Sequence, residues 1–280
     1  MMDKKEDLKP YLYFAEGCKN GSSCKFVHGD AATTVLTKPS RMVEIQQHFV
    51  SKRMRKCLKG IDQFILLTPY MVELIPEAAD KNIVVEGIYS NSDNIRSTTR
   101  LPKTLLYTGT FQEFAGVKLL VDAFMKTSDP MFRLVLCGSG PCTEYIESCA
   151  EKDSRIDLRG RVTREEAVRL QKSASLLVNP RRPGESITRY SFPSKTMEYM
   201  SSGTPMIGYR LEGIPDEYFE HMIVPDNITE DALTKTIERV LSLDKDVLAA
   251  MGESAKDFIL NKKNAKSQVL KMLDFLGDKN

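Results

Sequence analysis

From Leu105 onward, short apolar runs alternate with longer segments of helical period, and this alternation constrains the fold more than any other feature. Six runs have the length and composition of strands: Leu105–Thr108, Arg133–Cys137, Ile156–Leu158, Leu176–Asn179, Pro205–Tyr209 and Met222–Val224. The segment after the first run repeats apolar residues at i, i+3, i+4 and i+7, namely Val117, Leu120, Val121 and Phe124. Runs without period-two alternation are typical of a parallel sheet that is buried on both faces. The pattern therefore predicts a doubly wound, Rossmann-like α/β domain.

The rest of the chain divides around this domain. Three helical segments follow, at about 229–242, 246–261 and 264–276. Ahead of it lies a partial α/β segment, which comprises a helix candidate from Val43 to Leu58, a strand-like Phe64–Leu67, a helix start at Thr68–Pro69 and a strand Ile83–Val85. The polar stretch from Ser90 to Arg100 predicts a linker. We expect an irregular tail at 1–33, a partial domain with its linker at 34–99, the Rossmann-like domain at 100–262 and a C-terminal helix at 263–280.

Charge and cysteine usage limit the class of protein. Lys and Arg number 40 against 38 Asp and Glu, so the net charge of +2 argues against a general grip on nucleic acid. No apolar run approaches the roughly 20 residues of a membrane span, and the start from Met1 to Lys9 lacks the apolar stretch of a signal peptide. The six cysteines are interpreted as reduced thiols, because an α/β domain of this size needs no bridges. The composition predicts a soluble cytoplasmic protein with at most peripheral membrane contact.

The segment from Tyr190 to Pro205 has the pattern of a helix that faces a phosphate. Pro193 suits the first helical position and Gly203 suits the left-handed cap after the last turn, so the helix is expected at about 193–202. Its start follows a loop rich in charge and glycine, Asn179 to Arg189. Unpaired N–H groups and the positive end of the helix dipole would therefore face a site where a phosphate could lie.

One face of this predicted helix carries polar side chains. Ser191, Lys195 and Glu198 fall at i, i+4 and i+7. Glu198 lies five residues beyond the helix start, about 7 to 8 Å along the axis at 1.5 Å per residue, which is roughly the separation of a diphosphate from the far ribose hydroxyls. A carboxylate there can accept two hydroxyl hydrogen bonds.

Four motifs in this order resemble the family-four retaining glycosyltransferases, which have two Rossmann-like domains (GT-B), especially bacterial members that build surface polysaccharides. The motifs are Tyr107-Thr108-Gly109 with Gly116-Val117; Leu136-Cys137-Gly138-Ser139-Gly140-Pro141; Gly160-Arg161-Val162 before Glu165-Glu166; and Phe192-Pro193-Ser194-Lys195 through Gly203-Thr204-Pro205, followed by Gly213-Ile214-Pro215-Asp216-Glu217-Tyr218. Together they span about 115 residues and match the C-terminal, donor-binding domain.

The resemblance implies a nucleoside-diphosphate-sugar donor, no metal or other cofactor, and a sugar or lipid-linked glycan as acceptor. It places Glu198 on the ribose, and the amides around Ser191, Phe192 and Pro193 on the diphosphate. The remaining donor-binding residues that it implies are Gly109, Gly138 and Gly140, where backbone approaches the nucleotide, and Val162, which borders the base. It assigns no catalytic side chain.

The chain departs from this family's pattern at the donor site and at the front. Tyr190 stands where most members carry a sugar-contacting glutamate, and Thr110 and Ala115 stand where many carry basic residues for the diphosphate. We expect Lys195, Arg189 and Lys118 to neutralise the diphosphate in their place, with Lys195 as the foremost of the three. Residues 34–85 resemble only the last helix, strand and connection of the acceptor domain, so a partner subunit would supply the acceptor half.

Several residues also have a purely structural interpretation. Glu198 and Lys195 could be solvated helix residues, and Gly138 and Gly140 could simply form a strand-to-helix turn. Arg181 and Arg182 are more typical of a solvated loop, and the two histidines His48 and His221 receive no role.

A separate motif lies in the tail. Cys18, Cys24 and His28 have the spacing of the last three ligands of a Cys-Cys-Cys-His zinc finger, a class that binds single-stranded RNA. Structural zinc wants four ligands, and no cysteine precedes Cys18, so we expect no tight zinc site and no nucleic-acid partner. Three hypotheses follow: a glycosyltransferase, a nucleotide-sugar-binding remnant or subunit without catalysis, and an RNA-binding zinc protein.

Overall fold

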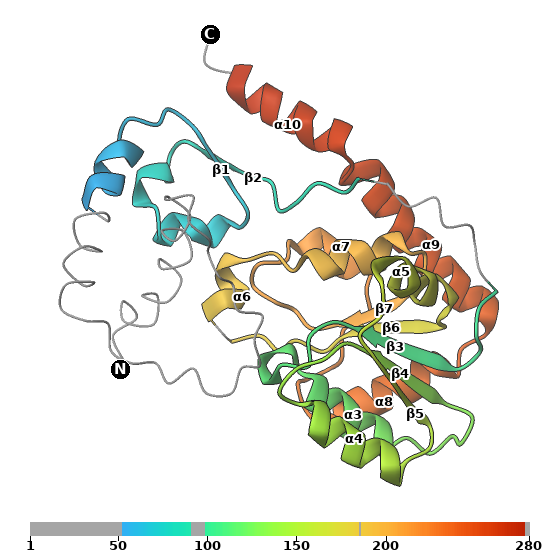
Figure 1. Ribbon diagram of the computed structural model, residues 1–280. Coiled ribbons are helices and arrows are strands. Elements are labelled where there is room, and N and C mark those ends of the chain that lie inside the picture. Colours follow the sequence, from blue (N-terminus) through green and yellow to red (C-terminus); the bar gives the residue numbers. More distant parts are fainter. Residues whose placement is uncertain (1–51, 91–98, 185, 278–280) are drawn as a thin grey trace, which may run out of the picture. The chain divides into compact units, whose positions relative to one another are not determined.

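The computed structural model describes residues 52–90, 99–184 and 186–277 (Figure 1). All named strands and helices belong to one compact unit that begins at Leu58. Residues 52–58 are helical, which agrees with the end of the helix predicted from Val43. The start of that helix, the tail 1–33 and most of the predicted linker lie outside the described residues. The division into four domains therefore stays a prediction.

A five-stranded parallel sheet forms the centre of the unit. Its strands are β3 (Thr104–Thr108), β4 (Arg133–Cys137), β5 (Ile156–Gly160), β6 (Leu176–Asn179) and β7 (Met206–Gly208), in the order β5-β4-β3-β6-β7. Every neighbouring pair is parallel, with Leu105 opposite Leu134 on one side and Leu176 on the other. The predicted α/β fold with a doubly wound parallel sheet is confirmed.

The sixth predicted strand, Met222–Val224, is wrong in extent. Ile223 makes a single parallel bridge with Ile207, by hydrogen bonds to Met206 and Gly208. Pro225 follows almost at once and has no N–H to continue a ladder. The edge of the sheet beyond β7 therefore carries a bridge rather than a strand.

Helices cover both faces of the sheet. They are α3 (Val117–Met125), α4 (Thr143–Lys152), α5 (Arg164–Ser173), α6 (Ser186–Tyr190), α7 (Ser194–Ser201), α8 (Glu230–Leu241), α9 (Lys245–Lys262) and α10 (Ala265–Gly277), with the short 3-10 turns η3 (Glu113–Ala115) and η4 (Asp216–Glu220). α3, α4 and α8 pack together on one face, and α5, α7 and α9 lie on the other (Figure 1). The three helices predicted after residue 228 are confirmed to within two residues at each end.

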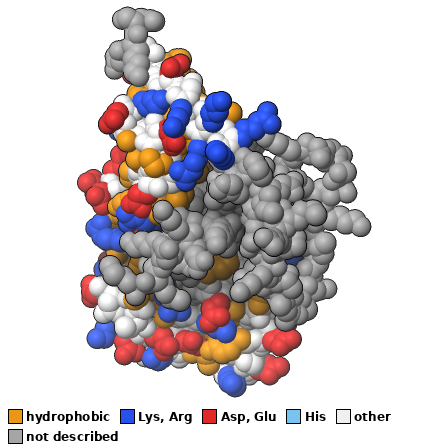
Figure 2. Space-filling model, turned by 90° about the vertical axis from the view of Figure 1, so that its left-hand side faces the viewer, with side chains coloured by type: hydrophobic (Ala, Val, Ile, Leu, Met, Phe, Trp, Pro, Cys, Tyr) orange, Lys and Arg blue, Asp and Glu red, His pale blue; other side chains and the backbone are white. Residues whose placement is uncertain are grey.

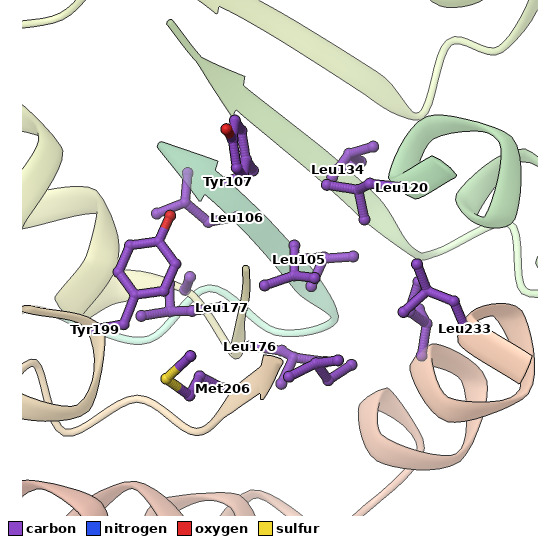
Figure 3. Packing of buried hydrophobic residues seen from close by; sticks show 14 of the residues in the cluster. Leu105, Leu106, Tyr107, Leu120, Leu134, Leu176, Leu177, Tyr199, Met206 and Leu233 are labelled. Atoms are coloured by element: carbon purple, nitrogen blue, oxygen red, sulfur yellow. The ribbon is translucent and has the colours of Figure 1, made fainter. Parts of the chain in front are cut away.

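The apolar core lies between these layers and the sheet (Figure 3). Successive residues of β3 point to opposite faces. Leu106 and its neighbour Leu177 lie on the side of Tyr199 from α7, while Leu120 and Leu233 from α3 and α8 lie on the other side. These side chains are fully buried, so the strands are apolar on both faces, as their composition predicted.

The segment ahead of the sheet forms a small parallel pair, β1 (Phe64–Leu66) and β2 (Asn82–Val84). The crossover between them contains the 3-10 turns η1 (Pro69–Glu73) and η2 (Pro76–Ala78). The helix start predicted at Thr68–Pro69 is confirmed as η1, with Thr68 as its N-cap residue. The predicted partial α/β segment is therefore a β-crossover-β unit with its own small apolar cluster around Phe64, Leu66 and Ala78.

The strand-like segment after β2 is held by the C-terminal helices. Tyr89 forms a bridge with Asn264, and Gln268 of α10 donates to the carbonyl of Gly87 at 2.8 Å. In the same segment, the carboxylate of Glu86 forms an ion pair with the ammonium of Lys263 at 2.5 Å, and both side chains are buried. Contacts between residues more than 170 positions apart thus hold residues 86–89, just before the predicted linker, against the C-terminal helices.

No described helix has both the length and the apolar composition that crossing a membrane would require. On the face drawn in Figure 2, acidic and basic side chains both occur in the upper and the lower parts of the coloured surface. Their mixture agrees with a net charge close to zero.

Candidate functional site

The order of the strands identifies one crevice. β3 is the first strand of the sheet in the chain, and its neighbours β4 and β6 are reached by connections that run in opposite directions. In open α/β sheets, ligands bind at this switch point, beyond the carboxyl ends of the strands. Here the switch point lies between Thr108, which ends β3, and Asn179, which ends β6.

Gly109 and Lys195 meet at this point. Gly109 continues β3 and donates from its N–H to the Cys137 carbonyl at 2.8 Å. A Cβ atom built on Gly109 would lie 1.9 Å from the Nζ atom of Lys195. The ammonium therefore occupies space that only a glycine leaves open. It also lies 4.4 Å from the centroid of the Tyr107 ring, a cation–π contact.

The surroundings of Lys195 change its proton affinity. Its side chain is half-buried, and burial lowers the pKa of Lys195 to about 8, a shift that the charge of Glu198 opposes and that of Arg181 reinforces. An anion that enters the crevice should interact strongly with this cation, because it compensates a charge that the protein has partly removed from water.

Arg181 is a second cation at the same edge, and the sequence analysis missed it. It follows the end of β6 by two residues, is half-buried, and its guanidinium lies 5.7 Å from the centroid of the Phe114 ring. The solvated loop that the sequence predicts for Arg181 is corrected by its half-buried side chain. Its position directly after a strand at the switch point was the available signal.

α7 presents Lys195 and Glu198 to the crevice, but it begins one residue later than predicted. Pro193 is the N-cap residue, with φ −75° and ψ 103°, and its carbonyl accepts from the N–H of Thr196 at 2.8 Å. The prediction that Pro193 occupies the first helical position is wrong, because its extended ψ places it outside the helix. The predicted left-handed cap at Gly203 is confirmed by a φ of +76°.

Glu198 lines a cavity of about 510 Å³ beside α7, in the middle of the helix. Other lining residues are Gln171, Val168 and Arg164 from α5, Phe192 from the turn before α7, and Ser194 at the start of α7. The Oε1 atom of Glu198 accepts a hydrogen bond from Nε2 of Gln171 at 2.5 Å. An exposed carboxylate is thus held at one oxygen on the wall of a cavity.

The turn before α7 is shaped by close backbone contacts. A Cβ atom at Gly213 would lie 2.2 Å from the carbonyl oxygen of Ser191, and the Gly213 N–H donates to the Thr188 carbonyl at 2.8 Å. Phe192 packs with its ring centroid 5.2 Å from that of Tyr218. The motif at 213–218 therefore supports the turn that contains Ser191 and Phe192.

The other predicted glycines pack against the loop after β3. A Cβ atom at Gly138 would lie 1.7 Å from the Gly109 carbonyl oxygen, and one at Gly140 would lie 2.7 Å from the backbone of Phe111. Both glycines are therefore needed for the turn itself, whether or not a nucleotide approaches. Val162 lies just before α5 and packs partly buried against the core.

The two remaining predicted cations contact other residues. Arg189 forms an ion pair with Glu73 of η1 and lies 4.0 Å from the centroid of the Tyr70 ring. Tyr190 donates to the same carboxylate at 2.8 Å. Nζ of Lys118 lies 4.0 Å from Oε1 of Glu113 on the surface. Of the three predicted cations, Lys195 is the one that the structure places against Gly109.

The candidate metal ligands Cys18, Cys24 and His28 lie outside the described residues. Across 52–90, 99–184 and 186–277, no group of three or more His, Cys, Asp or Glu side chains is arranged to hold a metal ion. His221 stacks on Phe258 with ring centroids 4.6 Å apart.

Comparison with known proteins adds the family. The family model of the glycosyl transferases group 1 matches residues 102–243. Among solved structures, the chain is similar to a TarM mutant from S. aureus in complex with Fondaparinux, alpha-GlcNAc-glycerol and UDP, with a TM-score of 0.64 and 15% identity over 80% of this chain and 46% of that one. It is also similar to a glycosyltransferase from Rickettsia africae ESF-5, with a TM-score of 0.62 and 15% identity over 81% of this chain and 68% of that one. At these identities the likeness shows the fold, and this chain spans less than half the length of TarM.

A short likeness of another kind exists. Zinc finger CCCH domain-containing protein 46 of Arabidopsis thaliana is 44% identical over 46 residues, which cover 16% of this chain and 8% of that protein. The family match is much longer, covers half of the 280 residues and includes all five strands of the central sheet. The chain belongs to the glycosyl transferases group 1 family.

Proposed function

We propose that this chain binds a nucleoside-diphosphate sugar at the β3–β6 switch point and serves the transfer of its glycosyl group to a hydroxyl acceptor, with retention of configuration. The observation that carries the proposal is the placement of Lys195 against Gly109, with Glu198 one turn further along α7. A cation at the strand ends suits a diphosphate, and a carboxylate one turn away suits the ribose hydroxyls. The TarM structure, in complex with UDP, makes UDP the first ligand to test.

The chemistry that these residues supply is stabilisation of the leaving group. In the transfer, the bond between the anomeric carbon and the diphosphate oxygen breaks, a bond to the acceptor oxygen forms, and the proton of the acceptor hydroxyl passes to the departing diphosphate or to water. Negative charge then grows on the diphosphate, and Lys195, Arg181 and the N-terminal amides of α7 stabilise it. No described side chain is assigned as base or nucleophile, and the mechanism needs no metal.

Tyr190 bears on the donor sugar. It stands where most members of the family that the chain resembles carry a glutamate. Its hydroxyl donates a hydrogen bond to Glu73. We infer a weaker hold on the reacting sugar than a glutamate would give. We infer also that the chain alone transfers slowly, since the other reactant needs a positioned acceptor site. The alternative is a nucleotide-sugar-binding remnant or subunit that does not catalyse.

The setting of the reaction is part of the proposal. The resemblance to enzymes that build surface polysaccharides favours a sugar or lipid-linked glycan as acceptor. The cytoplasm is favoured by the thiols of Cys57, Cys137, Cys142 and Cys149, which are free in the described structure.

A thermal-shift panel of ADP, GDP, CDP and UDP with their sugars tests the proposal. A ligand at one hundred times its dissociation constant should stabilise the protein by about 2.7 kcal/mol. The expected result is stabilisation by one nucleoside diphosphate and its sugars. No shift with any of them, in a protein with a cooperative unfolding transition, would contradict the donor site.

A second function is favoured by one observation, the 44% identity over 46 residues to a CCCH zinc finger protein. With Cys18, Cys24 and His28, this likeness supports a zinc site that binds RNA. Metal analysis of purified protein separates the two: we expect substoichiometric zinc and an unchanged stability in Cys18→Ser, because three ligands make a weak site. One tightly held zinc per chain would favour the zinc function.

A further inference from the structure

Gln171 is an unusual side chain in the wall of the cavity beside α7. It belongs to α5, it is polar, and only 1% of its surface is exposed. A buried amide is costly unless its hydrogen bonds are made. Its Nε2 group donates to Oγ1 of Thr108 at 3.1 Å and to Oε1 of Glu198 at 2.5 Å. Both amide hydrogens are therefore used.

The acceptor at Thr108 is itself fixed. The hydroxyl of Tyr199 accepts from the Thr108 N–H at 2.8 Å, donates to the Thr108 carbonyl at 3.1 Å, and lies 3.1 Å from Oγ1. If Tyr199 donates its single proton to the carbonyl, Oγ1 of Thr108 donates to Tyr199 and accepts from Gln171. Every proton in this chain of bonds then has one acceptor.

The same bonds fix the orientation of the amide. An ionised carboxylate only accepts, so the NH₂ end of Gln171 must face Glu198. The backbone of Gln171 is held as well, because its carbonyl accepts from Oγ1 of Thr204 at 2.7 Å. A buried amide, with both of its N–H groups bonded, thus reaches from β3 to an exposed glutamate.

We propose that Gln171 is a positioning residue, which holds the Glu198 carboxylate in place to receive the vicinal hydroxyls of the nucleotide ribose. A carboxylate offers about four lone-pair sites, so one bond to Gln171 leaves room for two hydroxyl donors. A glutamate on a helix surface otherwise samples several rotamers, and binding would have to restrict them. The bond to Gln171 makes that restriction a property of the free protein.

This inference rests on the proposed function, since it gives Glu198 the ribose. It predicts an effect that a merely structural residue would not have. Loss of Gln171 should weaken binding of a nucleotide that carries ribose hydroxyls and should spare the same nucleotide without them. The readout is the ratio of the two affinities, and each variant's affinity for the 2′,3′-dideoxy nucleotide shows whether its site is intact.

The experiment is calorimetry with UDP and 2′,3′-dideoxyuridine diphosphate, or with the corresponding pair for whichever of ADP, GDP and CDP the protein binds better. Gln171→Met keeps the volume and removes both donors. Gln171→Asn keeps an amide but shortens the side chain by one methylene, which moves the amide away from Glu198. It replaces the methionine variant in the test if that variant does not fold. Gln268→Met is the matched control, because Gln268 is also a buried glutamine, with Nε2 donating to a backbone carbonyl.

We expect the wild type and Gln268→Met to prefer the ribonucleotide by about tenfold or more. In Gln171→Met and Gln171→Asn, we expect that preference to fall severalfold with the dideoxy affinity unchanged. A wild-type preference that persists in both Gln171 variants would overturn the positioning role alone, as would an equal loss for both nucleotides. A wild type that binds neither nucleotide, or both equally, would refute the ribose role of Glu198, and the inference with it.

Discussion

The ammonium of Lys195 occupies the position that a side chain at Gly109 would fill, so the end of the first central strand and the first turn of α7 form one site. The contact joins residues 86 positions apart, Gly109 and Lys195, and leaves a cation at the switch point of a parallel sheet.

Gly109→Ala should weaken nucleoside-diphosphate binding about tenfold or more, because the added methyl group displaces the Lys195 ammonium. It should also lower the free energy of unfolding by about 1 to 2 kcal/mol, through backbone strain. Gly203→Ala is the control: Gly203 has a φ of +76° at the far end of α7, so its substitution costs similar stability without touching the site. Calorimetry and chemical denaturation give the two quantities. Equal affinities in the two variants would contradict the account.

Binding should weaken as the pH rises above about 8. Burial lowers the pKa of Lys195 to about 8, so the free protein loses this charge in that range. Because a bound diphosphate keeps the lysine protonated, affinity should fall up to roughly tenfold per pH unit above 8. Lys195→Met should bind weakly and show a flat profile between pH 7 and 9. A wild-type affinity that is constant over this range would rule out an anion on Lys195.

The lowered pKa of Lys195 also makes the stability of the fold depend on pH. Since the folded protein disfavours the charged lysine, its burial destabilises the fold below pH 8, and this penalty is relieved as the pH rises from 8 toward the unfolded value of 10.5. The free energy of unfolding of wild type should therefore rise relative to that of Lys195→Met between pH 7 and pH 10, and denaturation of both proteins at the two pH values measures this change. A difference that does not change with pH would show that Lys195 is fully solvated in the folded state.

Arg181→Gln should weaken diphosphate binding about tenfold, as loss of one charge-assisted contact. It should also move the pH midpoint of binding upward, because the charge of Arg181 helps to lower the pKa of Lys195. Arg182→Gln, the exposed neighbour, is the control and should do neither. Calorimetric titrations at several pH values measure both effects. An unchanged midpoint in Arg181→Gln would show that the charge of Arg181 does not act on Lys195, and an unchanged affinity would remove Arg181 from the diphosphate site.

How much of this could be predicted depends on the range of the interactions. The strands Arg133–Cys137 and Leu176–Asn179 were predicted to the residue, because burial on both faces gives each of them a continuous apolar run. Lys195 and Glu198 followed from helical spacing within one segment. The ion pair between Glu86 and Lys263 could not, since local patterns carry no sign of a partner 177 positions away.

Contacts near the site that the sequence does not indicate have the same origin. Arg189 was predicted to face the diphosphate, and its pairing with Glu73 depends on where η1 packs, which the sequence does not state. The sequence predicts a solvated loop at Arg181, because charged loop residues are usually solvated, whereas its side chain is half-buried in the structure. Pro193 was placed one residue too far into α7, since proline is tolerated both before and at the first helical position.

The buried pair supplies a prediction about stability. Glu86→Gln should lower the free energy of unfolding by about 1 to 3 kcal/mol, because it removes the buried carboxylate beside Lys263 and leaves the ammonium paired only with Glu217, whose side chain is half-exposed. Burial alone would raise the pKa of Glu86, but the hydrogen bond and charge of Lys263, a backbone hydrogen bond and the hydroxyl of Tyr218 together lower it. The stabilisation should therefore be complete above the unfolded pKa near 4.5 and disappear as the pH falls through the lower folded value. Equal stabilities of wild type and variant at pH 7 would refute this.

The most direct measurement of the donor site is calorimetric titration of UDP, or of the nucleoside diphosphate that binds best, into wild type, Glu198→Gln and Glu147→Gln. Glu147 is an exposed glutamate in the middle of α4 and matches Glu198 in setting but not in place. The account predicts that Glu198→Gln loses about 1.5 to 3 kcal/mol of binding free energy with an unchanged circular dichroism spectrum, while Glu147→Gln binds as the wild type does. Equal affinities in all three proteins would contradict a ribose at Glu198 and, with it, the proposed orientation of the donor.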